Sequence, residues 1–161
     1  MAIASVLTDS FKTELMRSGH NFDTAGATPA GNAFKLALYT SSANLGTTTT
    51  VYATTNEITN ASGSAYVAGG KALVNTGVTT STVTSHTDFA DLSVANGTAW
   101  TSASFTTRGC LIYNTSVVSG FTTNRAVCSI DFGGDKTVSN GTFSIEFPTN
   151  SSSAAIIRLT S

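Results

Sequence analysis

Short segments in which apolar and polar residues alternate, each followed by a turn signal, recur along this chain from residue 34 to its end. In FKLALYT, Phe34, Leu36 and Leu38 share one face, while Lys35, Ala37 and Tyr39 take the other. Many short strands at a spacing of roughly 8–12 residues are typical of antiparallel β-sandwiches and barrels. We therefore expect an all-β protein, an antiparallel sandwich of the jelly-roll or immunoglobulin-like type, as a single domain over residues 1–161.

Glycine-containing pairs predict where several of these strands end. Asn96-Gly97, Gly133-Gly134 and Asn140-Gly141 are expected to form turns, and strand breaks are expected near Gly77 and Ala90. In NRAVCSIDFG, strict alternation predicts an inward set and an outward set: Ala126, Cys128, Ile130 and Phe132 inward, with Arg125, Val127, Ser129 and Asp131 opposite.

One helix is expected near the start of the chain, over residues 8–18. In TDSFKTELMRSG, Thr8 or Asp9 can cap the first turn by accepting hydrogen bonds from free backbone N–H groups. Leu7, Phe11 and Leu15 recur at helical spacing, which predicts that this short helix packs one apolar stripe against the sheets.

The composition excludes several kinds of partner. Charged residues make up 11% of the 161 residues and the net charge is −1, so we expect no nucleic-acid binding, which needs clustered Lys and Arg. No apolar run approaches the ~20 residues that span a bilayer, and the N-terminus lacks the pattern of a secretory leader. A hydrophobic content of 40% argues against disorder. Cys110 and Cys128 are expected to be reduced core residues.

The residue types that carry catalysis or bind metals are sparse. His20 and His86 have no neighbours at metal-ligand spacing, apart from the weak H-x-D pair of His86 and Asp88. No G-x-S-x-G motif is present, and DFGGD lacks the other motifs of a kinase. Other candidate groups have simpler interpretations as turn caps or packing residues: Asp88, Asp91, Asp131 and Asp135 for Ca²⁺, and Tyr39, Tyr52, Tyr66, Tyr113 and Trp100 for a sugar-stacking platform. We therefore expect no enzyme and assign no catalytic, cofactor-binding or metal-binding residue.

Several segments, in order along most of the chain, resemble small structural proteins of tailed bacteriophages. They are FKLALYTSSANLG, TTNEI followed by AYVAGGKAL, TSASFTTRGCLIYN, RAVCSIDFGGDKTVSNGTFSIEFP and the final AAIIRL. The resemblance implies a virion component assembled in the host cytoplasm, most simply a capsid decoration (cement) protein that binds the major capsid protein. It also implies a homo-oligomer, for which we favour a trimer. No site residue is carried over from this resemblance.

Exposure and loop length suggest where such a protein would contact the capsid. We expect contacts through the segment before the helix and through the loops Ser41–Thr55 and Thr115–Thr123. The alternative is a tail, baseplate or fibre component that recognises host glycans, which would show clustered exposed aromatic residues and a Ca²⁺ site. Thr- and Ser-rich loops suit the first interpretation, because they are solvated yet nearly uncharged.

Overall fold

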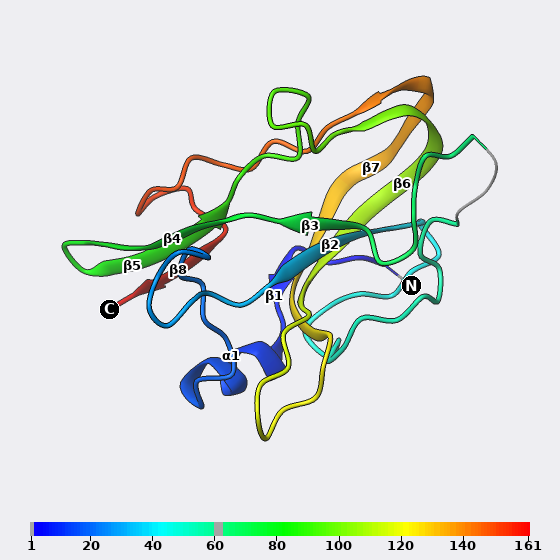
Figure 1. Ribbon diagram of the computed structural model, residues 1–161. Helices are drawn as coiled ribbons and strands as arrows, with labels where there is room; N and C mark the ends of the chain where they lie inside the picture. The colour runs from blue at the N-terminus through cyan, green and yellow to red at the C-terminus, as the bar shows by residue number, and fades with distance from the viewer. Residues whose placement is uncertain (1, 60–62) are drawn as a thin grey trace.

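The computed structural model describes residues 2–59 and 63–161 and contains two antiparallel sheets and one helix (Figure 1). The five-stranded sheet has the order β1-β7-β6-β2-β3, and the three-stranded sheet has the order β4-β5-β8. The elements are β1 (Val6–Leu7), α1 (Asp9–Met16), β2 (Phe34–Tyr39), β3 (Lys71–Leu73), β4 (Asn75–Ser81), β5 (Thr84–Phe89), β6 (Trp100–Asn114), β7 (Arg125–Phe143) and β8 (Ile157–Thr160). The all-β sandwich prediction is confirmed.

Strand β2 lies inside the large sheet and is buried on both faces. Phe34, Leu36 and Leu38 belong to the main core, which also includes residues of α1, β5 and β8. Ala37 and Tyr39 belong to a second core on the opposite face. The two faces assigned from alternation are therefore confirmed, and both of them exclude water.

The second core is covered by the N-terminal residues and by the Thr-rich segment that follows β2. Ile3, Ala43 and Leu45 are buried there, and Ile3 forms a parallel bridge with Leu45. Backbone hydrogen bonds fix the segment to the sheet, because Ala126 donates its N–H to the Thr50 carbonyl at 2.9 Å. Two of the segments expected to be contact loops thus serve as the outer layer of the sandwich.

Strands β6 and β7 form one long hairpin that bends without ending at its glycines. The turns expected at Gly133-Gly134 and Asn140-Gly141 are wrong, since both pairs lie inside β7. Gly133 and Asn140 have positive φ values of 73° and 46°, and the β6–β7 register shifts around Gly141, so Asn140-Gly141 lies at a bulge. Asn96-Gly97 does form its turn, with Gly97 at φ 66°.

The break expected near Gly77 is also misplaced. Gly77 lies within β4, where the register with β5 shifts between Asn75 and Val78, and the chain turns instead after Ser81. Phe143 is the last residue of β7, and beyond it Ile145 makes an isolated bridge with Leu92. Of the four glycine signals expected to end strands, only Asn96-Gly97 forms a turn, and the other three lie inside strands.

A further bulge in β7 overturns the strict alternation expected after Arg125. Ile112 pairs with Cys128 and Tyr113 pairs with Ala126, so Val127 is an extra residue. As a result Ala126 faces the second core and Val127 packs in the main core, the reverse of the predicted arrangement. Cys128 remains on the main-core face as expected.

Helix α1 begins after Thr8 and is shorter than the predicted 8–18. The Thr8 hydroxyl accepts a hydrogen bond from the Phe11 N–H at 3.2 Å, which makes Thr8 the N-cap. Phe11 is buried in the main core, whereas Leu7 belongs to β1. Ser18 adopts φ 61°, a left-handed conformation that ends the helix.

Candidate functional site

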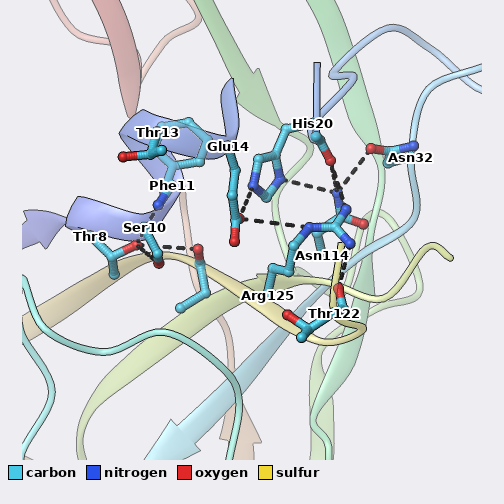
Figure 2. A network of polar contacts seen from close by, with 12 residues as sticks. Thr8, Ser10, Phe11, Thr13, Glu14, His20, Asn32, Asn114, Thr122 and Arg125 are labelled. Atoms are coloured by element: carbon cyan, nitrogen blue, oxygen red, sulfur yellow. Dashed lines mark hydrogen bonds and ion pairs between the residues drawn. The ribbon is translucent and has the colours of Figure 1, made fainter. Parts of the chain in front are cut away.

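Of the two histidines, His20 lies in a buried polar group that we call the arginine cluster: Arg125, Glu14, His20 and Asn114 (Figure 2). His20 Nε2 lies 2.8 Å from Glu14 Oε2, and Asn114 Nδ2 lies 3.0 Å from His20 Nδ1. An amide nitrogen only donates, so Nδ1 accepts and the proton resides on Nε2. The imidazole is therefore neutral, with both of its nitrogens bonded.

The electrostatic environment keeps His20 in this neutral form. Burial, and next the positive charge of Arg125, lower the pKa of His20 to about 4. Burial raises the pKa of Glu14, although Arg125 and Arg17 oppose that shift. The His20 ring also packs among aromatic rings, with its centroid 5.0 Å from that of Phe11.

Arg125 is fully buried and bonds mainly to backbone carbonyls. Its Nη2 donates to the Gly19 carbonyl at 2.6 Å and its Nη1 donates to the Thr122 carbonyl at 2.6 Å, while Nε lies 3.7 Å from Glu14 Oε2. The guanidinium thus joins the end of α1 to the loop Thr115–Thr123. The bulge at Val127 makes this contact possible. In a regular strand, two residues three positions apart face opposite sides, but the extra residue puts Arg125 on the same side as Cys128.

The arginine cluster is a structural element with its polar groups already engaged. Asn114 also donates to Asn32 Oδ1 at 2.9 Å and accepts from the Ser116 N–H at 2.9 Å. Arg125 Nε makes no hydrogen bond, but it lies within ion-pair distance of the Glu14 carboxylate. Neither His20 nor Glu14 lines the two hollows described below, so this cluster positions α1 and two loops against the sheet.

His86 and Asp88 lie on β5, two residues apart, without forming a pair. Asp88 accepts hydrogen bonds from the Phe89 and Ile156 N–H groups, at 2.8 Å and 3.2 Å, and burial raises its pKa. His86 is buried between its strand neighbours Thr79 and Arg158. Within residues 2–59 and 63–161, no three His, Cys, Asp or Glu side chains gather in a way that could hold a metal ion.

All four tyrosines of the chain converge on one buried carboxylate, Glu57, in what we call the tyrosine cluster: Glu57, Tyr39, Tyr52, Tyr66 and Tyr113. Glu57 Oε2 accepts from the Tyr52 hydroxyl at 2.6 Å, and Oε1 accepts from the Tyr66 hydroxyl at 2.7 Å. The Gly69 N–H also donates to Oε1, at 2.7 Å. Three neutral donors therefore solvate the carboxylate.

The remaining two tyrosines fix the surrounding loops. The Tyr39 hydroxyl donates to the Ala53 carbonyl at 2.6 Å, and the Tyr113 hydroxyl donates to the Gly69 carbonyl at 2.7 Å. The rings of Tyr52 and Tyr113 stack with centroids 4.6 Å apart. Burial, and next the charge of Glu57, raise the pKa of Tyr113 to about 12. The tyrosines are packing residues, as the sequence suggested, but they are brought together rather than dispersed.

The turn that brings the Gly69 N–H to Glu57 requires glycine. Gly69 and Gly70 have φ values of +90° and +68°, in the left-handed region that side chains disfavour. A Cβ atom at Gly70 would also collide with the Leu36 carbonyl. The Gly69-Gly70 pair in VAGGKAL is thus explained by the tyrosine cluster.

One hollow on the surface of the described residues is an apolar groove of about 810 Å³, which we call the edge groove. It lies between β1 and β7 on one side and the chain from Phe143 to Ile156 on the other. Its apolar lining comes mainly from Leu7, Ile130, Phe132, Phe143, Ile145 and Ile156. Cys110 and Cys128 lie at its buried side, and burial raises the pKa of both thiols. No sequence pattern indicated this groove.

The predicted contact loops have different surroundings. Ser41–Thr55 forms a shallow hollow of about 400 Å³, with Thr48, Thr49 and Thr50 in its lining. The loop Thr115–Thr123 exposes Val117, a residue that is 86% accessible. Trp100, considered with the tyrosines for a sugar-stacking platform but expected to be a packing residue, is buried beneath Lys71. Among the described residues no helix is long and apolar enough to cross a membrane.

No family model, curated protein or solved structure matches this chain.

Proposed function

We propose that this chain is a structural protein of a tailed-bacteriophage virion, a capsid decoration protein that binds the major capsid protein and stabilises its lattice. The resemblance described above supports the virion, and the character of one projecting surface supports a docking role. That surface, which we call the neutral tip, consists of residues 78–85 and 159–161.

The neutral tip is the observation that carries the proposal. It contains no charged residue, and Val78, Val83 and Leu159 are exposed on it at 51%, 59% and 54%. The hairpin of β4 and β5 extends away from the body at the left of Figure 1. Exposed aliphatic groups among threonines can be buried against another protein without the cost of removing charges from water.

The burial of the aromatic residues favours the capsid over glycan recognition by a tail part. Every Phe, Tyr and Trp residue is buried or half-buried, and all four tyrosine hydroxyls donate within the protein, two of them to Glu57. A glycan platform presents aromatic faces to solvent. This burial supports the head as the proposed location, and the proposal includes a homo-oligomer, with a trimer favoured, for which many repeated contacts would give avidity.

Separated phage components provide the direct test. Purified protein is mixed with isolated expanded heads and, separately, with isolated tails, and cosedimentation is measured. We expect saturable binding to heads at hundreds of copies per particle. Binding confined to tails, or no binding to either component, would contradict the proposal.

A pair of matched variants tests the neutral tip itself. Val83→Glu places a charge on the tip and is expected to weaken head binding at least about tenfold. Val94→Glu is the control, because Val94 is exposed at 64% in the turn containing Gly97, away from the tip. Equal binding by both variants would show that the tip is not the contact surface.

A further inference from the structure

The edge groove is lined by apolar side chains that the fold covers only in part. Phe132, Phe143 and Phe147 are half-buried, as are Ile130 and Ile145, and all five line the groove. Their covered sides pack against the main core. A second surface that excluded water from their open sides would therefore stabilise the assembly it forms.

The backbone of the β7 wall is largely engaged, so an occupant cannot add to it as a regular strand. The Asp131 N–H donates to Ser5 Oγ at 3.0 Å, and the Gly133 N–H donates to Asp131 Oδ1 at 3.0 Å. The β6–β7 register also shifts here, between Thr107 and Gly109. The groove therefore recognises its occupant mainly through side chains.

The two walls of the edge groove carry opposite charges. Lys136 belongs to β7, whereas Glu146 belongs to the chain after β7, which crosses to the small sheet (Figure 1). Both residues are exposed, and neither takes part in an ion pair of the described residues. The nearby Asp131 and Asp135 are paired with Arg108. One wall thus offers a free cation and the other a free anion.

This arrangement of charges is complementary to itself under rotation. When copies of one chain surround an axis that runs along the groove, the walls follow one another in the same order around the ring. The Lys136 wall of each copy then meets the Glu146 wall of its neighbour. A second copy therefore carries the matching charges already, and a net charge of −1 causes little repulsion between identical chains.

We propose that copies of this chain associate through the edge groove, with Lys136 of each copy paired with Glu146 of its neighbour and the apolar linings facing one another across the axis. The inference rests on the homo-oligomer of the proposed function and supplies its contact surface. No residue of the neutral tip lines the groove, so the tip stays free to meet the capsid.

Sedimentation velocity of the purified protein over a range of concentrations tests the association. We expect a wild-type oligomer. Lys136→Glu and Glu146→Lys each place like charges in every contact, and each should weaken association at least about tenfold. Lys12→Glu is the matched control, because it makes the same change of charge at an exposed position of α1 outside the groove and should associate as the wild type does. Circular dichroism checks that all variants are folded.

Combining the two charge changes should restore association. The double variant Lys136→Glu/Glu146→Lys exchanges the charges of the two walls and should associate as the wild type does. A mixture of the two single variants should also recover association, completely in a dimer and in part in a ring of three, where one contact still joins like charges. Recovery in the mixture requires that the charges pair between different molecules.

Three results would overturn the proposal. The first is a wild-type chain that stays monomeric at every concentration, which would mean that another kind of molecule covers the groove. The second is association that neither single variant weakens, which would place the interface elsewhere. The third is a mixture of the single variants that recovers no association.

These measurements need no phage particle, so they separate this inference from the proposed function. Head binding by a monomeric chain would contradict the groove contact alone. An oligomer that depends on Lys136 and Glu146 but binds no head would contradict the capsid role alone.

Discussion

The arginine cluster and the tyrosine cluster each hold a carboxylate beside the large sheet, half-buried Glu14 and buried Glu57, but they compensate its charge in different ways. Glu14 lies near the fully buried guanidinium of Arg125, and the His20 ring lies between the charged Glu14 carboxylate and the neutral Asn114 amide. Glu57 has no cation within ion-pair distance among the described residues and is bonded to two hydroxyl groups and one backbone N–H. The first arrangement depends on opposite charges and the second on neutral donors in fixed positions.

The difference has a consequence for mutation. Removing one member of a buried ion pair leaves an uncompensated charge, whereas removing one of three neutral donors leaves a carboxylate that is still partly solvated. We therefore expect the arginine cluster to be intolerant of single changes and the tyrosine cluster to lose stability in steps.

The largest expected effect follows from removing the guanidinium. Arg125→Met should lower the free energy of unfolding by about 3–5 kcal/mol, because Glu14 loses its neighbouring positive charge and the Gly19 and Thr122 carbonyls lose their donor. Chemical denaturation at neutral pH measures this loss. Arg108→Met is the control, since Arg108 is 36% exposed in its pair with Asp131 and its loss should be far smaller. Comparable losses of stability in Arg125→Met and Arg108→Met would show that the burial of Arg125 is not the cause of its effect.

A smaller loss is expected when the tyrosine cluster loses its charge but keeps its shape. In Glu57→Gln, the side-chain amide replaces one acceptor oxygen with a donor, which then faces a hydroxyl or the Gly69 N–H. We expect a loss of about 2–3 kcal/mol, measured by chemical denaturation. A loss equal to that of Arg125→Met would mean that the two clusters do not differ in the way described.

The arginine cluster should also make stability depend on pH. His20 takes up its proton near pH 6.5 when unfolded but only near pH 4 when folded, so the unfolded state gains protons first as the pH falls. Between pH 7 and pH 4 this should remove about 2–3 kcal/mol of stability. The raised pKa values of Glu14 and Asp88 act in the opposite direction, because the folded state protonates these carboxyls first.

Unfolding of His20→Gln over the same pH range isolates the histidine. The variant keeps the carboxyl contributions, so the difference between its pH profile and that of the wild type belongs to His20. We expect this difference to grow as the pH falls below about 6.5. Parallel profiles would contradict the neutral imidazole inferred from the hydrogen bonds.

The smallest effects should come from single hydroxyl groups around Glu57. Tyr52→Phe removes one donor from a half-buried ring and should cost about 1 kcal/mol. Tyr66→Phe should cost about twice as much, because the Tyr66 hydroxyl also accepts from the Leu38 N–H at 2.9 Å and is fully buried. Thermal unfolding of the two variants side by side measures the ratio of their stability losses. A larger loss for Tyr52→Phe than for Tyr66→Phe would show that the hydrogen bond from the Leu38 N–H contributes little.

Local sequence patterns predicted those parts of the fold that local geometry controls. The two faces of β2, the capping of α1 at Thr8 and the turn at Asn96-Gly97 follow from residues a few positions apart. The same reasoning misplaced turns at Gly133-Gly134 and Asn140-Gly141, because a glycine that permits positive φ serves a bulge as well as a turn.

Sequence reasoning predicted less about the loops, buried clusters and grooves that form between distant segments. The loop Ser41–Thr55 was expected to meet a partner, and nothing in its sequence indicated that it also covers the second core. The four tyrosines are far apart in the chain, so nothing in their spacing indicated that they meet at Glu57. The edge groove likewise arises where segments from both ends of the chain come together.

The sequence by itself determined an all-β chain with one helix, because strand and helix periodicities are properties of neighbouring residues. Only the tertiary structure decided that Arg125 turns toward Glu14, since one extra residue at Val127 reverses the faces and carries no signal of its own. It also decided which edges stay unpaired, because strand pairing joins residues that are distant in the chain and depends on the whole sheet.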